Sequence, residues 1–157
     1  MLEEIVLKIL GKHWKQNNNE DRKTADIYNE HTQEYGDVKA AFTPYPSEPT
    51  PSKLKKKDHI TLDHKSVVDY FEKFGDKLSI YVAVANYPER KTSLLKINSK
   101  DCFDIMINNP ERIYSRSMRS FKDKVKKVGI KFEEFEDITK SVPRKFIKEI
   151  EEIAVKK

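Results

Sequence analysis

Two aspartates and a lysine could act together in the segment from Ala25 to Phe42, which has the pattern of two short strands joined by a turn. If the turn centres on residues 31 and 32, residues facing each other across the antiparallel pair have index sums of 63. Asp26 then faces Asp37, and Lys39 lies on the face of Asp37 because side chains alternate along a strand. Like charges directly opposite each other destabilise a strand pair, so we expect a third group to neutralise them.

A divalent cation would neutralise the two carboxylates. Magnesium takes hard oxygen ligands, typically one or two carboxylates with water and substrate phosphate, and manganese accepts the same donors. A bound cation activates water and stabilises charge on a phosphodiester, while Lys39 would position the water or offset phosphate charge. This set predicts metal-dependent phosphodiester hydrolysis, with Asp26 and Asp37 as ligands of Mg²⁺ or Mn²⁺. Without metal, removing either carboxylate should be neutral or stabilising.

A structural alternative remains open, in which the hairpin is only charged and Lys39 neutralises Asp37. The placement of the three side chains also depends on register. A slip of one residue would move Asp37 to the opposite face of the sheet.

The elements around this hairpin suggest an α/β or α+β domain with a mixed sheet flanked by helices. Periodicity and capping residues predict each element in turn. The expected elements are a helix over 2–15, strands over 25–29 and 34–42, a helix over 63–74 capped by Asp63 and stopped by Gly75, a strand over 77–86 buried on both faces, a strand over 92–97, a short helix capped by Ser99 and ending before Pro110, a basic helix over 114–128 stopped by Gly129, a strand over 130–132 and a helix from about 143.

Asp26, ten intervening residues and the run Asp37-Val38-Lys39 resemble the PD-(D/E)XK motif of restriction-endonuclease-like nucleases. The order of elements over residues 2–107 is similar to that fold, although Ala25 stands where the family often has proline. The resemblance implies a restriction-endonuclease-like sheet and a catalytic set of Asp26, Asp37 and Lys39. Such nucleases often supply one more acid from the first helix, and Glu3 beside its apolar stripe is the candidate.

Basic residues gather in two places that could contact a nucleic-acid backbone. One is a lysine-rich loop after four prolines, and the other is a set of cations at helical spacing in residues 112–127. The loop contributes Lys53, Lys55, Lys56 and Lys57, and the helical set contains Arg112, Arg116, Arg119, Lys122 and Lys126, of which Arg116 and Arg119 are the chosen DNA contacts. Either group could equally be a solvated surface.

Composition narrows the function further. The 157 residues suit a single domain over 1–157, with 36% charged residues and a net charge of +5. No apolar run reaches the ~18 residues of a membrane helix, and the only cysteine, Cys102, fits the core of a cytoplasmic protein. With four glycines, none of the glycine-rich nucleotide-binding motifs can be written.

The sequence therefore predicts a cytoplasmic, magnesium-dependent DNA endonuclease. Cutting both strands symmetrically would favour a homodimer, because one small domain carries one site. The alternatives are a non-catalytic, basic nucleic-acid-binding protein and a basic adaptor for an acidic protein. Metal binding by Asp26 and Asp37, which we call the acid pair, would distinguish the endonuclease from these two alternatives.

Overall fold

A mixed β-sheet forms the centre of the protein. The computed structural model describes residues 6–7, 10–17, 25–43, 60–86, 91–109, 111–115 and 117–135. Within them, six strands are ordered β1-β2-β3-β5-β6-β8, and β4 pairs with β7 in a separate ribbon. The bounds are β1 Trp14–Gln16, β2 Ile27–Asn29, β3 Glu34–Thr43, β4 Ile60–Leu62, α3 His64–Phe74, β5 Leu78–Asn86, β6 Lys91–Asn98, α4 Ser99–Met106, β7 Ile113–Ser115, α5 Met118–Val128 and β8 Glu133–Phe135. The predicted α+β class is confirmed.

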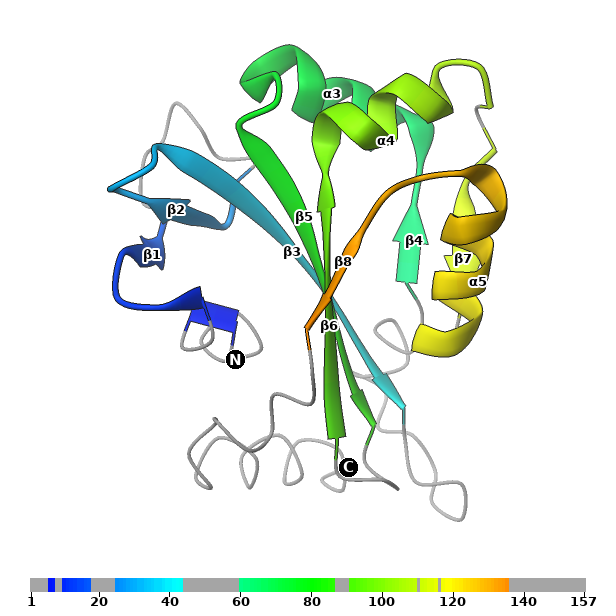
Figure 1. Ribbon diagram of the computed structural model, residues 1–157, viewed down its shortest axis with the longest axis horizontal. Coiled ribbons are helices and arrows are strands. Elements are labelled where there is room, and N and C mark those ends of the chain that lie inside the picture. Colours follow the sequence, from blue (N-terminus) through cyan, green and yellow to red (C-terminus); the bar gives the residue numbers. More distant parts are fainter. Residues whose placement is uncertain are drawn as a thin grey trace.

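The long strands β3, β5 and β6 cross the molecule, with α3 and α4 at one end and α5 to one side (Figure 1). Strands β3 and β5 are parallel, whereas the other pairs in this sheet are antiparallel. A parallel pair needs a crossover connection, and the described part of that connection holds β4 and α3.

The main core lies on one face of the sheet. Ile80 and Val82 of β5 pack there with Val67 of α3, Met106 of α4 and Phe121 of α5. The described side chains of β5 are buried on both faces, as the nearly continuous apolar run predicts. Because Asp37 pairs with Ile80 and Lys39 with Val82, both charged side chains lie on the core face.

The hairpin has the predicted register. Ile27 pairs with Gly36 and Tyr28 with Tyr35, so Asp26 and Asp37 occupy opposed positions just beyond the paired residues of β2. The side chain of Ile27 is fully buried on the other face of the sheet.

Three predictions of local structure are wrong. The helix predicted over 2–15 ends by Gly11, whose φ of 105° is left-handed, and Trp14–Gln16 is instead the strand β1. The start of the helix predicted over 114–128 is the strand β7, because Ile113–Ser115 pairs with Ile60–Leu62. The strand predicted over 130–132 lies at Glu133–Phe135.

Helix caps agree better with the sequence. Asp63 caps α3 and Gly75 follows its end, as predicted, and Gly129 follows α5. Asn98, rather than Ser99, caps α4. The helix expected from about residue 143 lies outside the described residues. Among the described helices, none is long and apolar enough to cross a membrane.

Candidate functional site

Asp37 is the centre of the candidate site. It is 8% exposed and lies at the edge of the core, on β3. The Tyr70 hydroxyl on α3 donates a 2.9 Å hydrogen bond to Oδ2 of Asp37. The Lys39 ammonium lies 3.6 Å from the same oxygen and 5.8 Å from the centre of the Tyr70 ring. A hydroxyl and a cation therefore share one carboxylate oxygen.

Asp26 is held by the backbone of the facing strand. The Val38 N–H donates a 2.7 Å hydrogen bond to Oδ2 of Asp26, and the Asp26 N–H donates to the Gly36 carbonyl at 2.8 Å. These bonds tie Asp26 to the residues on either side of Asp37. The two carboxylates are thus fixed by local hairpin geometry, with Lys39 two residues further along the same strand.

Tyr70 is a member of this site that the sequence pattern does not reveal. Burial, followed by the charge of Asp37 and the hydrogen bond to it, raises the pKa of Tyr70 well above its usual value. Asp26 and Asp63 add smaller effects in the same direction. Tyr70 is therefore a neutral hydrogen-bond donor, and its hydroxyl is buried with Asp37 as its acceptor.

Asp63 joins the site from the start of α3, where its carboxylate accepts a 2.7 Å hydrogen bond from the Ser66 N–H. Burial alone would raise the pKa of Asp63, but the hydrogen bonds from Ser66 and the charges of Lys39 and Lys65 outweigh it and hold the pKa below its ordinary value. The sequence identifies Asp63 only as a helix cap. Its electrostatic link to Lys39 depends on how α3 packs beside β3.

Replacing Asp63 should separate its capping role from its charge. Asp63→Ala should lower the free energy of unfolding by about 1 kcal/mol, the usual value of an N-cap, whereas Asp63→Asn should retain most of that stability. Because the folded-state pKa is lowered, the stabilisation by ionised Asp63 is present above the unfolded-state pKa and is lost as the pH falls through the folded-state value. The unfolding free energy of the wild type should therefore fall more than that of Asp63→Asn between about pH 5 and pH 2. Urea titrations across this range measure the difference, and parallel curves would contradict it.

The carboxylate oxygens of Asp26 and Asp37 are ligands of the kind that a hard divalent cation prefers. A carboxylate offers about four acceptor sites on two oxygens, and the contacts of Asp37 with Tyr70 and Lys39 both use its Oδ2. Within the described residues, no group of three or more histidines, cysteines, aspartates or glutamates is placed to hold a metal ion. A cation held by two carboxylates would complete its shell with water and substrate oxygens, as Mg²⁺ commonly does.

Comparisons with protein-family models, curated proteins and solved structures find no match. The interpretation of the site therefore depends on its own geometry.

Several predicted site residues lie outside the described part of the chain. They are Glu3, Lys53, Lys55, Lys56, Lys57 and Arg116. Arg119 is described and is exposed on α5. Cys102 is fully buried in the core, as predicted, and burial raises the pKa of its thiol to about 12. It is therefore a neutral packing residue rather than a nucleophile.

The predicted basic stripe divides between the two sides of α5. Lys122 forms a 2.7 Å ion pair with Glu134 on one side, and Lys126 lies 5.8 Å from the centre of the Phe132 ring. Arg112 instead lines a cavity with Lys124 and Lys127 on the other side. The spacing in the sequence does not predict this division, because the first part of the segment is a strand.

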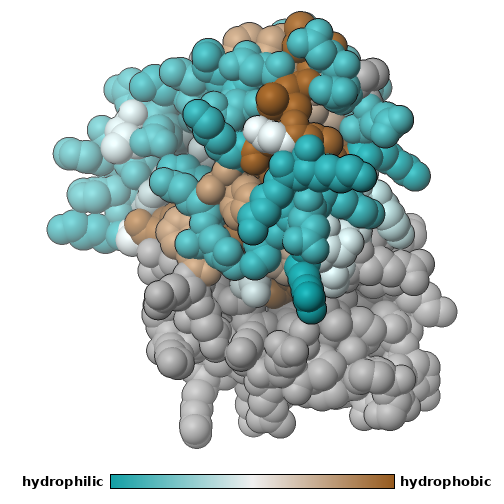
Figure 2. Space-filling view, turned by 45° about the vertical axis from the view of Figure 1, so that its right-hand side comes forward, coloured by the Kyte–Doolittle hydropathy of each residue, from teal (hydrophilic) through white to brown (hydrophobic). Residues whose placement is uncertain are grey.

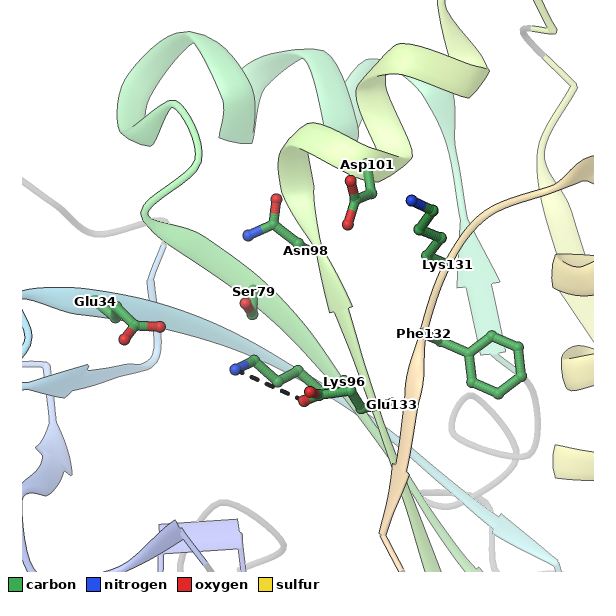
Figure 3. Close-up of a pocket in the computed structure, with 8 residues that line it drawn as sticks. All are labelled: Glu34, Ser79, Lys96, Asn98, Asp101, Lys131, Phe132 and Glu133. Atoms are coloured by element: carbon green, nitrogen blue, oxygen red, sulfur yellow. Dashed lines mark ion pairs between the residues drawn. The ribbon is translucent and has the colours of Figure 1, made fainter.

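A separate cavity of about 240 Å³ lies on the opposite face of the sheet from Asp37. Figure 3 shows its lining, where Lys96 lies beside Glu133 at 3.9 Å. Lys96 pairs with Tyr81, whose neighbours in sequence face the main core. Because it lies on the opposite face of the sheet, this cavity does not extend the site around Asp37.

Proposed function

We propose that this protein is a metal-dependent DNA endonuclease of the PD-(D/E)XK type. The observation that carries the proposal is the opposition of Asp26 and Asp37 across the hairpin, with Lys39 on the same strand face as Asp37. Carboxylate, carboxylate and lysine are the groups that metal-dependent phosphodiester hydrolysis requires. The resemblance of the motif to restriction-endonuclease-like nucleases agrees with this assignment.

Each side chain has a distinct role in the proposed reaction. Asp26 and Asp37 would hold a Mg²⁺ or Mn²⁺ ion, which when bound supplies an activated water and stabilises charge on the phosphate. Val38 orients Asp26 through its N–H, and Tyr70 orients Asp37 through its hydroxyl. Lys39 is placed to direct a water molecule or to offset the developing negative charge. These contacts fix the carboxylates before substrate arrives.

The proposal also includes a location and an assembly. The low cysteine content of the sequence favours the cytoplasm. Cutting both strands of a duplex symmetrically would favour a homodimer, with two copies of the chain related by a twofold axis. The net charge of +5 favours a polyanionic substrate.

A non-catalytic nucleic-acid-binding protein is the second candidate function. It is favoured by the engagement of Oδ2 of Asp37 by both the Tyr70 hydroxyl and the Lys39 ammonium. In this case the lysine replaces the cation as the neutralising charge, and the acid pair only stabilises the hairpin. Divalent cations would then change neither the melting temperature nor the integrity of bound DNA.

Incubation of the protein with plasmid, branched and single-stranded DNA tests the two candidates. With magnesium or manganese we expect cleavage of at least one substrate, and with EDTA none. Lys39→Met should reduce the rate by roughly 100-fold or more, the usual cost of a group that stabilises transition-state charge, while magnesium affinity changes little.

The matched control is Lys96→Met, because Lys39 and Lys96 have side chains that are 24% and 30% exposed and each is paired with one carboxylate. It should cleave at the wild-type rate. Intact DNA in every metal-containing reaction, despite binding of the DNA, would refute the endonuclease and favour the second candidate.

A further inference from the structure

A groove between β7 and α5 has the chemistry of a nucleic-acid site. Its cavity is about 550 Å³ and is bounded by Arg112, Ile113 and Tyr114 on one side and by Lys124, Lys127 and Val128 on the other; we call these six residues the β7–α5 groove. A second cavity of about 280 Å³ shares Asn109, Glu111, Ile113 and Val128 with it. On this side of the molecule, apolar surface runs between hydrophilic side chains (Figure 2).

The positive charge of the groove is not neutralised by the described protein. Elsewhere in the described residues, lysines such as Lys15 and Lys73 pair with carboxylates. Arg112, Lys124 and Lys127 form no ion pair within the same part of the chain. The ammonium of Lys124 donates instead to the Tyr114 carbonyl, which holds the lysine at the groove without removing its charge. One carboxylate, that of Glu111, also lines the cavity, so the cations outnumber it by three to one.

The groove also presents stacking and apolar surface. The Arg112 guanidinium lies 5.7 Å from the centre of the Tyr114 ring, and Val128 is 38% exposed beside it. Duplex DNA offers mainly phosphates to such a surface because its bases are stacked inside. An unpaired strand offers both phosphates and base faces, and proteins bind it with cations along the backbone and aromatic groups under the bases.

We propose that the β7–α5 groove binds a single-stranded segment of nucleic acid. The phosphates contact Lys124 and Lys127, and a base stacks against the Arg112–Tyr114 pair. An acidic polypeptide would satisfy the cations but offers no base to stack against the Arg112–Tyr114 pair, so the observations favour the nucleic acid.

The groove is joined to the helix that contacts the acid pair. Leu62 pairs with Ile113 of the groove, and the chain continues from Leu62 through Asp63 into α3, whose Tyr70 donates a hydrogen bond to Asp37. Resting on the proposed endonuclease function, this placement identifies the substrate class as DNA with an unpaired strand, such as a branched or flapped end.

Equilibrium binding in EDTA tests the groove without any contribution from cleavage. The probe is a fluorescein-labelled oligothymidylate of about 12 nucleotides, within the range that single-strand-binding domains cover, and fluorescence anisotropy gives its affinity at several salt concentrations. The double variant Lys124→Gln/Lys127→Gln should bind more weakly and have a salt slope smaller by about 1.4, or ~0.7 for each lost phosphate contact. Tyr114→Leu should weaken binding about tenfold through lost stacking.

The matched control is Lys73→Gln/Lys100→Gln, which lowers the net charge of +5 by the same two units. Both control lysines are exposed on α3 and α4, where each pairs with a carboxylate one turn away. The control should bind the oligonucleotide like the wild type. Equal losses in the two double variants would show that only net charge matters and would overturn the proposal. Equal affinity for a duplex of the same length, or preferential binding of polyglutamate, would overturn it as well.

Cleavage assays keep the groove proposal separate from the endonuclease proposal. If the groove variants lose oligonucleotide binding and the wild type cuts no DNA with magnesium, the groove is supported and the endonuclease fails. If the wild type cuts DNA but the groove variants bind and cut single strands equally well, the endonuclease stands and the groove is refuted.

Discussion

Replacing Asp37 with asparagine should abolish metal-dependent cleavage while leaving the fold nearly as stable as before. Asparagine has the shape of aspartate, and its carbonyl oxygen can still accept the 2.9 Å hydrogen bond from Tyr70. It lacks the charge that binds a cation. Because metal stabilisation of the transition state amounts to several kcal/mol, the rate should fall by about 1,000-fold or more.

Asp37→Ala should instead lose both activity and stability. It leaves the buried Tyr70 hydroxyl without its acceptor and removes the ion-pair partner of Lys39. An unsatisfied buried donor costs about 1–3 kcal/mol, so this variant should melt lower than Asp37→Asn with or without magnesium. The sequence alone favoured a neutral or stabilising effect of removing the carboxylate, and the contacts of Tyr70 and Lys39 reverse that expectation.

Thermal melting and DNA cleavage of both Asp37 variants provide the measurement, and Tyr70→Phe is the control. Tyr70→Phe removes the same hydrogen bond but retains the carboxylate, so it should cleave more slowly than the wild type and still far faster than Asp37→Asn. Cleavage by Asp37→Asn at the wild-type rate would mean that the acid pair is structural, and the endonuclease proposal would then fail.

Gly36→Ala should be among the most destabilising single changes in the hairpin. An added Cβ would lie 2.6 Å from Cγ1 of Ile27 and 2.9 Å from Cε2 of Tyr81. These neighbours are 0% and 1% exposed, so neither can move into solvent. Forcing a methyl group into packed surroundings costs about 1–3 kcal/mol. Because the Gly36 carbonyl accepts from the Asp26 N–H, the displacement should also reduce any cleavage.

Urea denaturation of a double-mutant cycle measures this clash. Ile27→Ala removes the Cγ1 and Cδ1 atoms that the methyl group added by Gly36→Ala would meet, although it is itself destabilising. The double variant should therefore lose less stability than the sum of the two single variants. Additive losses would show that the Ile27 side chain does not oppose the added methyl group.

The part of the site that is close in sequence could be predicted. A hairpin with a short connection has few possible registers, and a turn centred on residues 31 and 32 gives the observed one. Asp26, Asp37 and Lys39 follow from that register without knowledge of any other element.

The rest of the site depends on contacts between distant segments. Tyr70 lies in the apolar stripe of its helix, so the sequence pattern predicts a packing role and does not reveal that its hydroxyl donates a hydrogen bond to Asp37. The strands β4 and β7 have three residues each, too few for alternation to identify them, and their pairing joins positions about 50 residues apart. Trp14 continued the helical period of the N-terminal segment, but Gly11 interrupts the helix before it.

The parallel ladder between β3 and β5 determines the order in which the candidate site is assembled. Tyr35 pairs with Leu78, 43 positions later, and the same separation holds for every pair in the ladder. Contacts at such separations form slowly because a long loop must close first. The hairpin can bring Asp26 and Asp37 together early, but Tyr70 reaches Asp37 only after the crossover has docked. During synthesis on the ribosome, the acid pair therefore emerges before Tyr70, and the contacts of the candidate site are complete only after the crossover and β5 have been made.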